Sequence, residues 1–227
     1  MSINFLENVF NLIISLDKSL IVIILLSLKT SLLALLIATL LSLPVGSYLV
    51  FYNNKFQYFI ILMSNTFMGL PPVVLGLLIY ILISKSGIFG FLNILYTPSA
   101  MILSQTLLII PIIISLTYEE IYKKNKKYNI LLNSLNLNNY SKAKTLIYES
   151  RYALITVILT GYGRASAEVG AILIVGGNIN NYTRVMTTTI ANETNKGNIE
   201  IAVLLGIILL IISLIITLII RSIRKLY

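Results

Sequence analysis

The sequence predicts an all-α, polytopic membrane protein with about five transmembrane helices. Hydrophobic residues occupy 57% of the 227 positions and charged residues 11%, and the mean hydropathy is +0.92. An ordinary soluble domain carries about 25% charged residues, so too few remain here to cover a water-facing surface. The charges are also separated by long uncharged stretches, and about 20 apolar residues suffice for a helix to cross the bilayer. These observations exclude a water-soluble globular enzyme.

Residues 1–18 are expected to form an amphipathic helix on the outer membrane surface, ahead of a membrane domain at 19–227. Apolar side chains recur there at helical spacing, opposite Glu7 and three asparagines, a pattern typical of interfacial helices. The stretch Ser19–Leu28 is too short to cross alone and is expected to extend the first span. The alternative is a sixth crossing by residues 3–28.

The first two spans are predicted within the uncharged stretches 30–54 and 56–84. The second stretch contains Pro71 and Pro72, which remove two backbone donors and should break the helix near its middle. Freed carbonyls at membrane depth are tolerated only against protein or water. Asn65, Thr66 and Pro71 are therefore candidates to line a translocation path, and a plain structural kink is the alternative.

Three further spans are predicted at about Ala100–Tyr118, Tyr152–Gly176 and Ile201–Ile220. The span Tyr152–Gly176 is unusual because it contains Arg164 and Glu168. A charged side chain at the centre of a lipid-facing helix costs about 2.5 to 3.5 kcal/mol on insertion scales. Both side chains should therefore face protein or a watery cavity.

A spacing of four residues would place Arg164 and Glu168 on one helix face, where they can neutralise one another or pair across a dimer. Small residues surround them, Gly170 among them, and small residues let helices approach closely. Arg164, Glu168 and Gly170 are therefore candidates for a translocation path or gate. A salt bridge that only fixes helix packing is the alternative.

The distribution of Lys and Arg predicts the orientation of the chain. With five spans and a cytoplasmic C-terminus, eleven of these residues fall inside and five outside or near the outer interface. Cytoplasmic loops carry the excess of Lys and Arg. We therefore expect a multi-pass protein of the cell membrane with its N-terminus outside and its C-terminus in the cytoplasm.

The cytoplasmic connection 119–151 is far longer than a minimal turn. We expect a helix over 127–136, a turn at 137–139 in which Asn138 adopts a left-handed conformation, and a second helix capped by Ser141. The result would be a helix–turn–helix that projects from the membrane. A basic loop that simply obeys the charge rule is the alternative.

These residues resemble a known family. Leu137-Asn138-Asn139, the segment 149–151, Gly161-Tyr162-Gly163-Arg164 and the segment 167–171 resemble the permease subunits of ATP-binding-cassette (ABC) importers around their EAA cytoplasmic loop. The segments 176–179, 182–188 and 193–197 are similar to tungstate-type oxyanion permeases, and Leu70–Leu77 fits the same family. The chain departs from the family where it lacks Glu-Ala-Ala and has Asn138 in place of the usual Gly.

The resemblance implies a type I importer fold, a homodimer in the lipid bilayer, and two partners. A cytoplasmic ABC ATPase dimer would dock on the turn, at Leu135, Leu137, Asn138, Asn139, Tyr140 and Ser141. An extracytoplasmic solute-binding protein would deliver the anion near Arg184, Thr187 and Thr188, for which a solvated loop is the alternative. The chain has no P-loop motif. ATP and Mg would therefore be bound by the partner, and no cofactor, enzymatic activity or nucleic-acid partner is expected of this chain.

Other functions remain open from the sequence. The same machine would carry molybdate, sulfate or phosphate if selectivity rests with the binding protein, although tungstate is favoured. A secondary transporter or channel would use Glu168 as a proton-coupled carboxylate. A membrane-embedded enzyme is the weakest alternative, because Cys, His and Trp are all absent and no nucleophile or metal-ligand cluster stands out.

Overall fold

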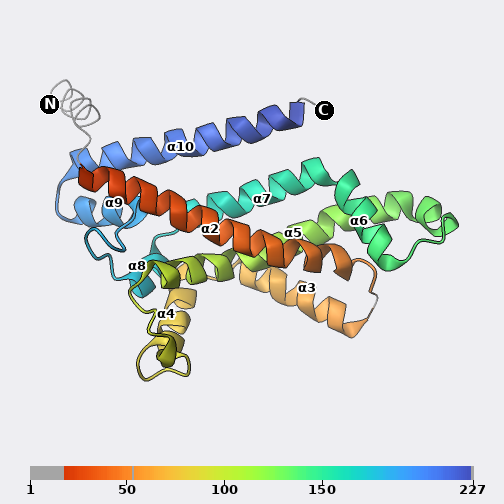
Figure 1. The fold of residues 1–227 in the computed structure, drawn as a ribbon, viewed down its shortest axis with the longest axis horizontal. Helices are drawn as coiled ribbons and strands as arrows, with labels where there is room; N and C mark the ends of the chain where they lie inside the picture. The colour runs from red at the N-terminus through yellow and green to blue at the C-terminus, as the bar shows by residue number, and fades with distance from the viewer. Residues whose placement is uncertain (1–17, 53, 226–227) are drawn as a thin grey trace. The chain divides into compact units, whose positions relative to one another are not determined.

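A computed structural model of the chain describes residues 18–52 and 54–225. Within these ranges the regular structure is entirely helical, with no strand (Figure 1). The helices in chain order are α2 (Lys18–Leu49), α3 (Lys55–Met68), α4 (Pro72–Ile83), the 3₁₀ helix η1 (Gly90–Leu92), α5 (Pro98–Ser134), α6 (Asn139–Glu149), α7 (Arg151–Ser166), α8 (Gly170–Gly176), α9 (Met186–Asn195) and α10 (Ile199–Lys225).

Helices long and apolar enough to cross a membrane are α2, α5 and the segment Ile199–Ile219 of α10. The interrupted pairs α3/α4 and α7/α8 raise the number to five if each pair is one span. The all-α, polytopic membrane fold is therefore confirmed. Helix α2 begins at Lys18, so Ser19–Leu28 does extend the first span. The amphipathic helix predicted over 1–18 lies outside the described residues except for Lys18, and so does most of the alternative crossing at 3–28.

The two consecutive prolines interrupt the second span as predicted. Helix α3 ends at Met68 and α4 begins at Pro72, the first helical position, where the missing N–H of proline has no cost. Pro44 and Pro111 lie inside α2 and α5, which continue past them.

The helix predicted over 127–136 is not a separate element. Helix α5 runs through this region to Ser134, because no glycine or proline follows the apolar span and the Lys-rich segment is a good helix former. The polar segment 178–200 contains α9.

The chain forms two compact units, and the described residues of 1–33, 72–105 and 166–227 make up the first. In one part of its core, Ile79 of α4 packs with Met101 at the start of α5 and with Ile172 and Val175 of α8. In another part, Ile23 of α2 packs with Met186 of α9 and Leu205 of α10. The Ser27 hydroxyl of α2 also accepts a hydrogen bond of 2.7 Å from the Met186 backbone N–H.

The second unit consists of residues 34–71 and 106–165. Its core joins Val50 and Ile121 with Leu132 near the end of α5, Leu146 of α6 and Leu154 of α7. Helix α6 therefore packs through Leu146 into the core of the second unit.

Candidate translocation path and coupling turn

The fourth span is not a continuous helix, which corrects the prediction that Arg164 and Glu168 share a helix face. Arg164 lies in the last turn of α7, which ends at Ser166, whereas α8 begins at Gly170. Glu168 therefore stands in the break between the two helices. A spacing of four residues places Arg164 and Glu168 on one face only if a single helix contains both, and α7 ends between them.

Glu168 is built into the start of α8. Its side-chain Oε1 accepts a hydrogen bond of 2.9 Å from the Ala171 N–H, and its backbone oxygen accepts one of 2.8 Å from the Thr187 hydroxyl. Only 4% of Glu168 is exposed. The first N–H groups of a helix have no partner within the helix, so the carboxylate satisfies one of them. The backbone oxygen of Glu168 links the start of α8 to α9. The prediction that Glu168 faces protein and not lipid is confirmed.

Two glycines allow α4 and α8 to approach closely. A Cβ atom on Gly170 would lie 2.5 Å from a methyl group of Val73, and one on Gly76 would lie 2.7 Å from the Cα atom of Ala171. A side chain at either position would push the two helices apart. The expected role of Gly170 in close packing is therefore confirmed, while its role in a translocation path stays a prediction.

The residues around the proline break lie at the end of α3 and beyond it. Asn65 and Thr66 are exposed within the chain. The Asn65 side-chain oxygen accepts a short hydrogen bond from the Ser115 hydroxyl of α5, whereas the Thr66 hydroxyl donates to Leu62 in its own helix. Pro71 is exposed as well. The role of all three residues in a path stays a prediction.

The turn between α5 and α6 exists, but its geometry differs from the prediction. Asn136 adopts the left-handed conformation, with φ of 49°, whereas Asn138 is extended. The Asn138 side chain caps α6 by accepting a hydrogen bond of 2.8 Å from the Ser141 N–H. Ser141 is therefore inside the helix and is not its cap. Asparagine serves both positions well, so the residue type alone did not decide between them.

The same turn presents apolar and aromatic side chains outward. Leu135 is 59% exposed and Tyr140 72% exposed, and Asn138 and Asn139 are exposed beside them. Leu137 instead packs against the core of the second unit. The turn is thus anchored by one leucine and offers its neighbours to a partner.

The residues expected to meet a binding protein divide into two groups. Thr187 and Thr188 are buried, at 8% and 0% exposed. Their hydroxyls are used inside the protein, by the backbone oxygens of Glu168 and Val185. Arg184 is partly exposed. A docking contact in this arrangement therefore falls to Arg184, and the role of all three residues stays a prediction.

Sequence reasoning missed a polar cluster after α9. The Glu193 carboxylate accepts hydrogen bonds from Asn198 at 2.7 Å and from Lys196 at 2.8 Å. These bonds, together with the charge of Arg184, hold the pKa of Glu193 below its ordinary value of 4.5. Within residues 18–52 and 54–225, no three acidic, His or Cys side chains are placed to share a metal ion.

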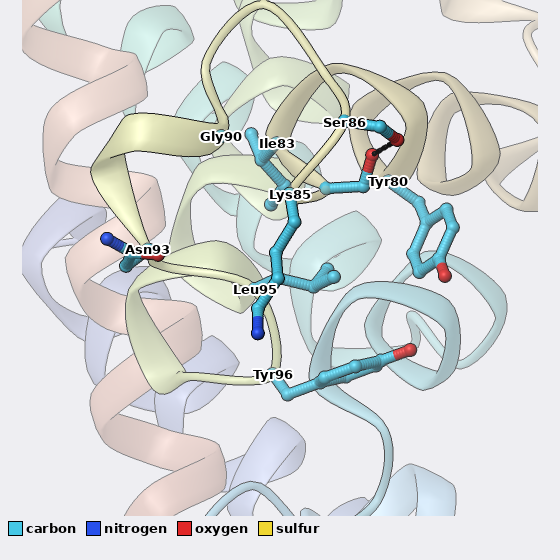
Figure 2. A pocket seen from close by; sticks show the side chains of 9 residues that line it. Tyr80, Ile83, Lys85, Ser86, Gly90, Asn93, Leu95 and Tyr96 are labelled. Atoms are coloured by element: carbon cyan, nitrogen blue, oxygen red, sulfur yellow. Dashed lines mark hydrogen bonds between the residues drawn. The ribbon is translucent and has the colours of Figure 1, made fainter.

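A cavity of about 500 Å³ was also missed; it lies where α4 ends (Figure 2). Its polar lining consists of Tyr80, Ser84, Lys85, Ser86, Asn93 and Tyr96. These residues come from the end of α4 and the loop before α5, a region that the sequence marks only by its glycines. No motif grouped them, because the fold of the loop brings them together.

Named proteins of known class resemble the chain over most of its length. It is 43% identical over 157 residues to the tungstate uptake system permease protein TupB of Campylobacter jejuni, an alignment that spans 69% of this chain and 66% of that protein. It is 36% identical to a probable anion ABC transporter permease protein of Haloferax volcanii, over 79% of this chain and 80% of the relative.

A second tungstate uptake permease TupB, from Peptoclostridium acidaminophilum, is 35% identical over 86% of each chain. No protein-family model matches the sequence. The chain belongs to the family of ABC transporter permease subunits that includes the tungstate uptake permeases.

Proposed function

We propose that this chain is the membrane permease of an ABC importer that takes up a tetrahedral oxyanion, with tungstate as the cargo. Two relatives are named as tungstate uptake permeases and a third as an anion permease, which supports both the class of machine and the cargo. Molybdate, sulfate and phosphate have the same shape and remain the competing cargoes.

The observation that carries the proposal is the exposed turn between α5 and α6. Leu135 and Tyr140 are large and exposed, while Leu137 and Leu146 fasten the turn to the core of its unit. Aromatic side chains that fill a partner's pocket dominate the binding energy of many interfaces. A rigid turn with such side chains can transmit the movement of a cytoplasmic ATPase dimer to the helices behind it.

An energy source outside this chain is needed. Moving one negative charge into a cell with an inside-negative potential of 100 mV costs about 2.3 kcal/mol, so a dianion costs about 4.6 kcal/mol before any concentration gradient. The sequence carries no P-loop, so ATP and Mg are bound by the partner subunit and the permease performs no chemistry of its own.

The remaining parts of the assembly follow from this role. Two copies of the chain form the permease, with the N-terminus outside and the C-terminus in the cytoplasm. A solute-binding protein meets the outer face near Arg184. The path runs past Arg164 and Glu168 and past the proline break at Asn65, Thr66 and Pro71.

Replacing Tyr140 tests the coupling turn. The change Tyr140→Ala should weaken ATPase binding about tenfold or more, because an exposed aromatic anchor is lost from the interface. Co-purification of the tagged permease with its ATPase measures the effect. The matched control is Tyr58→Ala on α3, since Tyr58 is 69% exposed and Tyr140 is 72% exposed. Equal ATPase recovery in both variants would contradict the docking role.

A further inference from the structure

The cavity at the end of α4 has a lining suited to an anion. Lys85 is the single charged side chain among the residues that line it, and no carboxylate is among them. The hydroxyl groups of Tyr80, Tyr96 and Ser86 add further donors. The volume of about 500 Å³ falls within the range of small-ligand sites. A cationic, donor-rich cavity of this size attracts a small anion and repels cations.

The end of a helix would normally disfavour an anion, because the last carbonyls carry partial negative charge. Here the loop satisfies these groups. The Ser84 N–H donates to the Tyr80 oxygen at 2.9 Å, the Phe89 N–H to the Leu82 oxygen at 2.8 Å, and the Ser84 hydroxyl to the Ile81 oxygen at 3.1 Å. The free acceptors at the end of α4 are therefore largely removed.

The loop that forms the cavity is tightly built. A Cβ atom on Gly87 would lie 2.2 Å from the Ile81 oxygen, and one on Gly90 would lie 2.5 Å from the Ser84 oxygen. Both glycines let the loop fold back onto the end of α4. The backbone that carries Lys85 is thus held close to the end of α4.

Tyr96 lines the cavity in a strained conformation. Its φ is 60°, a region that bulky side chains rarely occupy. Its N–H donates to the Val175 oxygen of α8 at 2.9 Å, and a Cβ atom on Gly177 would lie 2.7 Å from its ring. A strained backbone conformation of this kind persists where the surrounding contacts hold it in place, and such residues are concentrated at functional sites.

The two tyrosine rings lie beside one another on one side of the cavity (Figure 2), with their centroids 6.4 Å apart. The neighbouring Tyr80 side chain raises the pKa of Tyr96 above its ordinary value of 10.0. Tyr80 belongs to α4, whereas Tyr96 is attached to α8 through Val175. A ligand held by both would bridge the two helices.

We propose that this cavity is an oxyanion-binding subsite of the permease itself, in which the Lys85 ammonium and the Tyr80 and Tyr96 hydroxyls hold the anion. The inference rests on the proposed function, because it takes the cargo to be an oxyanion. With the N-terminus outside, the subsite lies at the extracytoplasmic end of α4, where cargo released by the binding protein first meets the permease.

The test measures tungstate bound at equilibrium to the complex of permease and ATPase in phosphatidylcholine nanodiscs, without the binding protein. We expect saturable binding that Lys85→Gln weakens about tenfold, as expected for loss of a charge-assisted hydrogen bond. Lys85→Arg should retain binding. Tyr96→Phe should weaken binding while keeping the ring in place, and it serves as the second variant if Lys85→Gln does not fold.

The matched control is Lys196→Gln, which removes the same charge from the same side of the membrane at a lysine already paired with Glu193; its binding should equal that of the unmodified protein. Unchanged binding in Lys85→Gln would overturn the subsite. The unmodified protein is also measured in nanodiscs made of phosphatidylglycerol. Loss of its tungstate binding in these discs would overturn the subsite as well, because a lipid phosphate would then be the occupant.

The failure of this inference is distinguishable from that of the proposed function. One outcome is a complex that takes up tungstate with ATP but binds no tungstate when its binding protein is absent. This outcome would overturn the subsite and leave the proposed importer function intact. A complex with no ATP-driven uptake of any oxyanion would overturn the proposed function.

Discussion

Glu168 is the single residue whose role changes most between sequence and structure. Its position inside an apolar stretch was enough to predict that it faces protein, because a lipid-facing carboxylate is costly. Its function as a helix cap was not predictable, since no proline or run of polar residues marks the break between α7 and α8. The cap and the Thr187 bond depend on tertiary packing.

Substitution of Glu168 separates its structural role from a charge-dependent one. Glu168→Ala should destabilise the permease by about 1 kcal/mol, the usual cost of losing a helix N-terminal cap. Glu168→Gln keeps an acceptor oxygen for the Ala171 N–H and should recover most of this stability. Thermal unfolding of the purified complex measures both. A Gln variant as unstable as the Ala variant would contradict the cap, whereas a stable Gln variant without transport would support a gate.

The Glu193 cluster predicts a pH dependence. The folded protein lowers the pKa of this carboxyl group below 4.5 through Asn198, Lys196 and Arg184. A group with a depressed folded pKa contributes stability above its unfolded pKa, and this contribution is lost as the pH falls through the folded value. The temperature at the midpoint of thermal unfolding should therefore decrease as the pH is lowered below about 4.5. Glu193→Gln should be less stable at pH 7 and show a smaller decline on acidification; an unchanged pH profile would argue against the assignment.

Among the helices, the apolar spans were the most predictable elements. Charge-free stretches located α2, α5 and α10, and Pro71 and Pro72 located the break between α3 and α4. Ends of helices in polar segments were not predictable. Helix α5 continues to Ser134 through a charged stretch that contains no helix breaker, and α9 is built on threonines that are buried by contacts distant in sequence.

The approach of α4 and α8 depends on Gly76. Gly76→Ala should cost about 1 to 3 kcal/mol, typical of overpacking a close contact, because its Cβ would meet backbone atoms of Ala171. Gly206→Ala in α10 is the matched control, since no atom lies within 4 Å of its added Cβ and alanine favours a helix by about 1 kcal/mol over glycine. Thermal unfolding of the two variants compares them; equal stability would contradict the close contact.

At the scale of the whole molecule, the sequence defined the kind of machine better than its sites. The composition predicted a membrane protein, and the motifs on either side of the turn between α5 and α6 and in the following segments indicated the family. The cavity at the end of α4 and the Glu193 cluster arise from residues that only the fold assembles. The cavity lies in a segment with no motif of its own, and the family resemblance of 193–197 did not indicate that its side chains form a cluster.

The central claim is that this permease moves an oxyanion inward only when a separate ATPase drives it. The most direct measurement is tungstate uptake into proteoliposomes that contain the permease, its ATPase and its binding protein, with ATP either supplied to the ATPase or withheld. We predict accumulation with ATP and none without it. Accumulation driven by a proton gradient in the absence of ATP and of the ATPase would contradict the account.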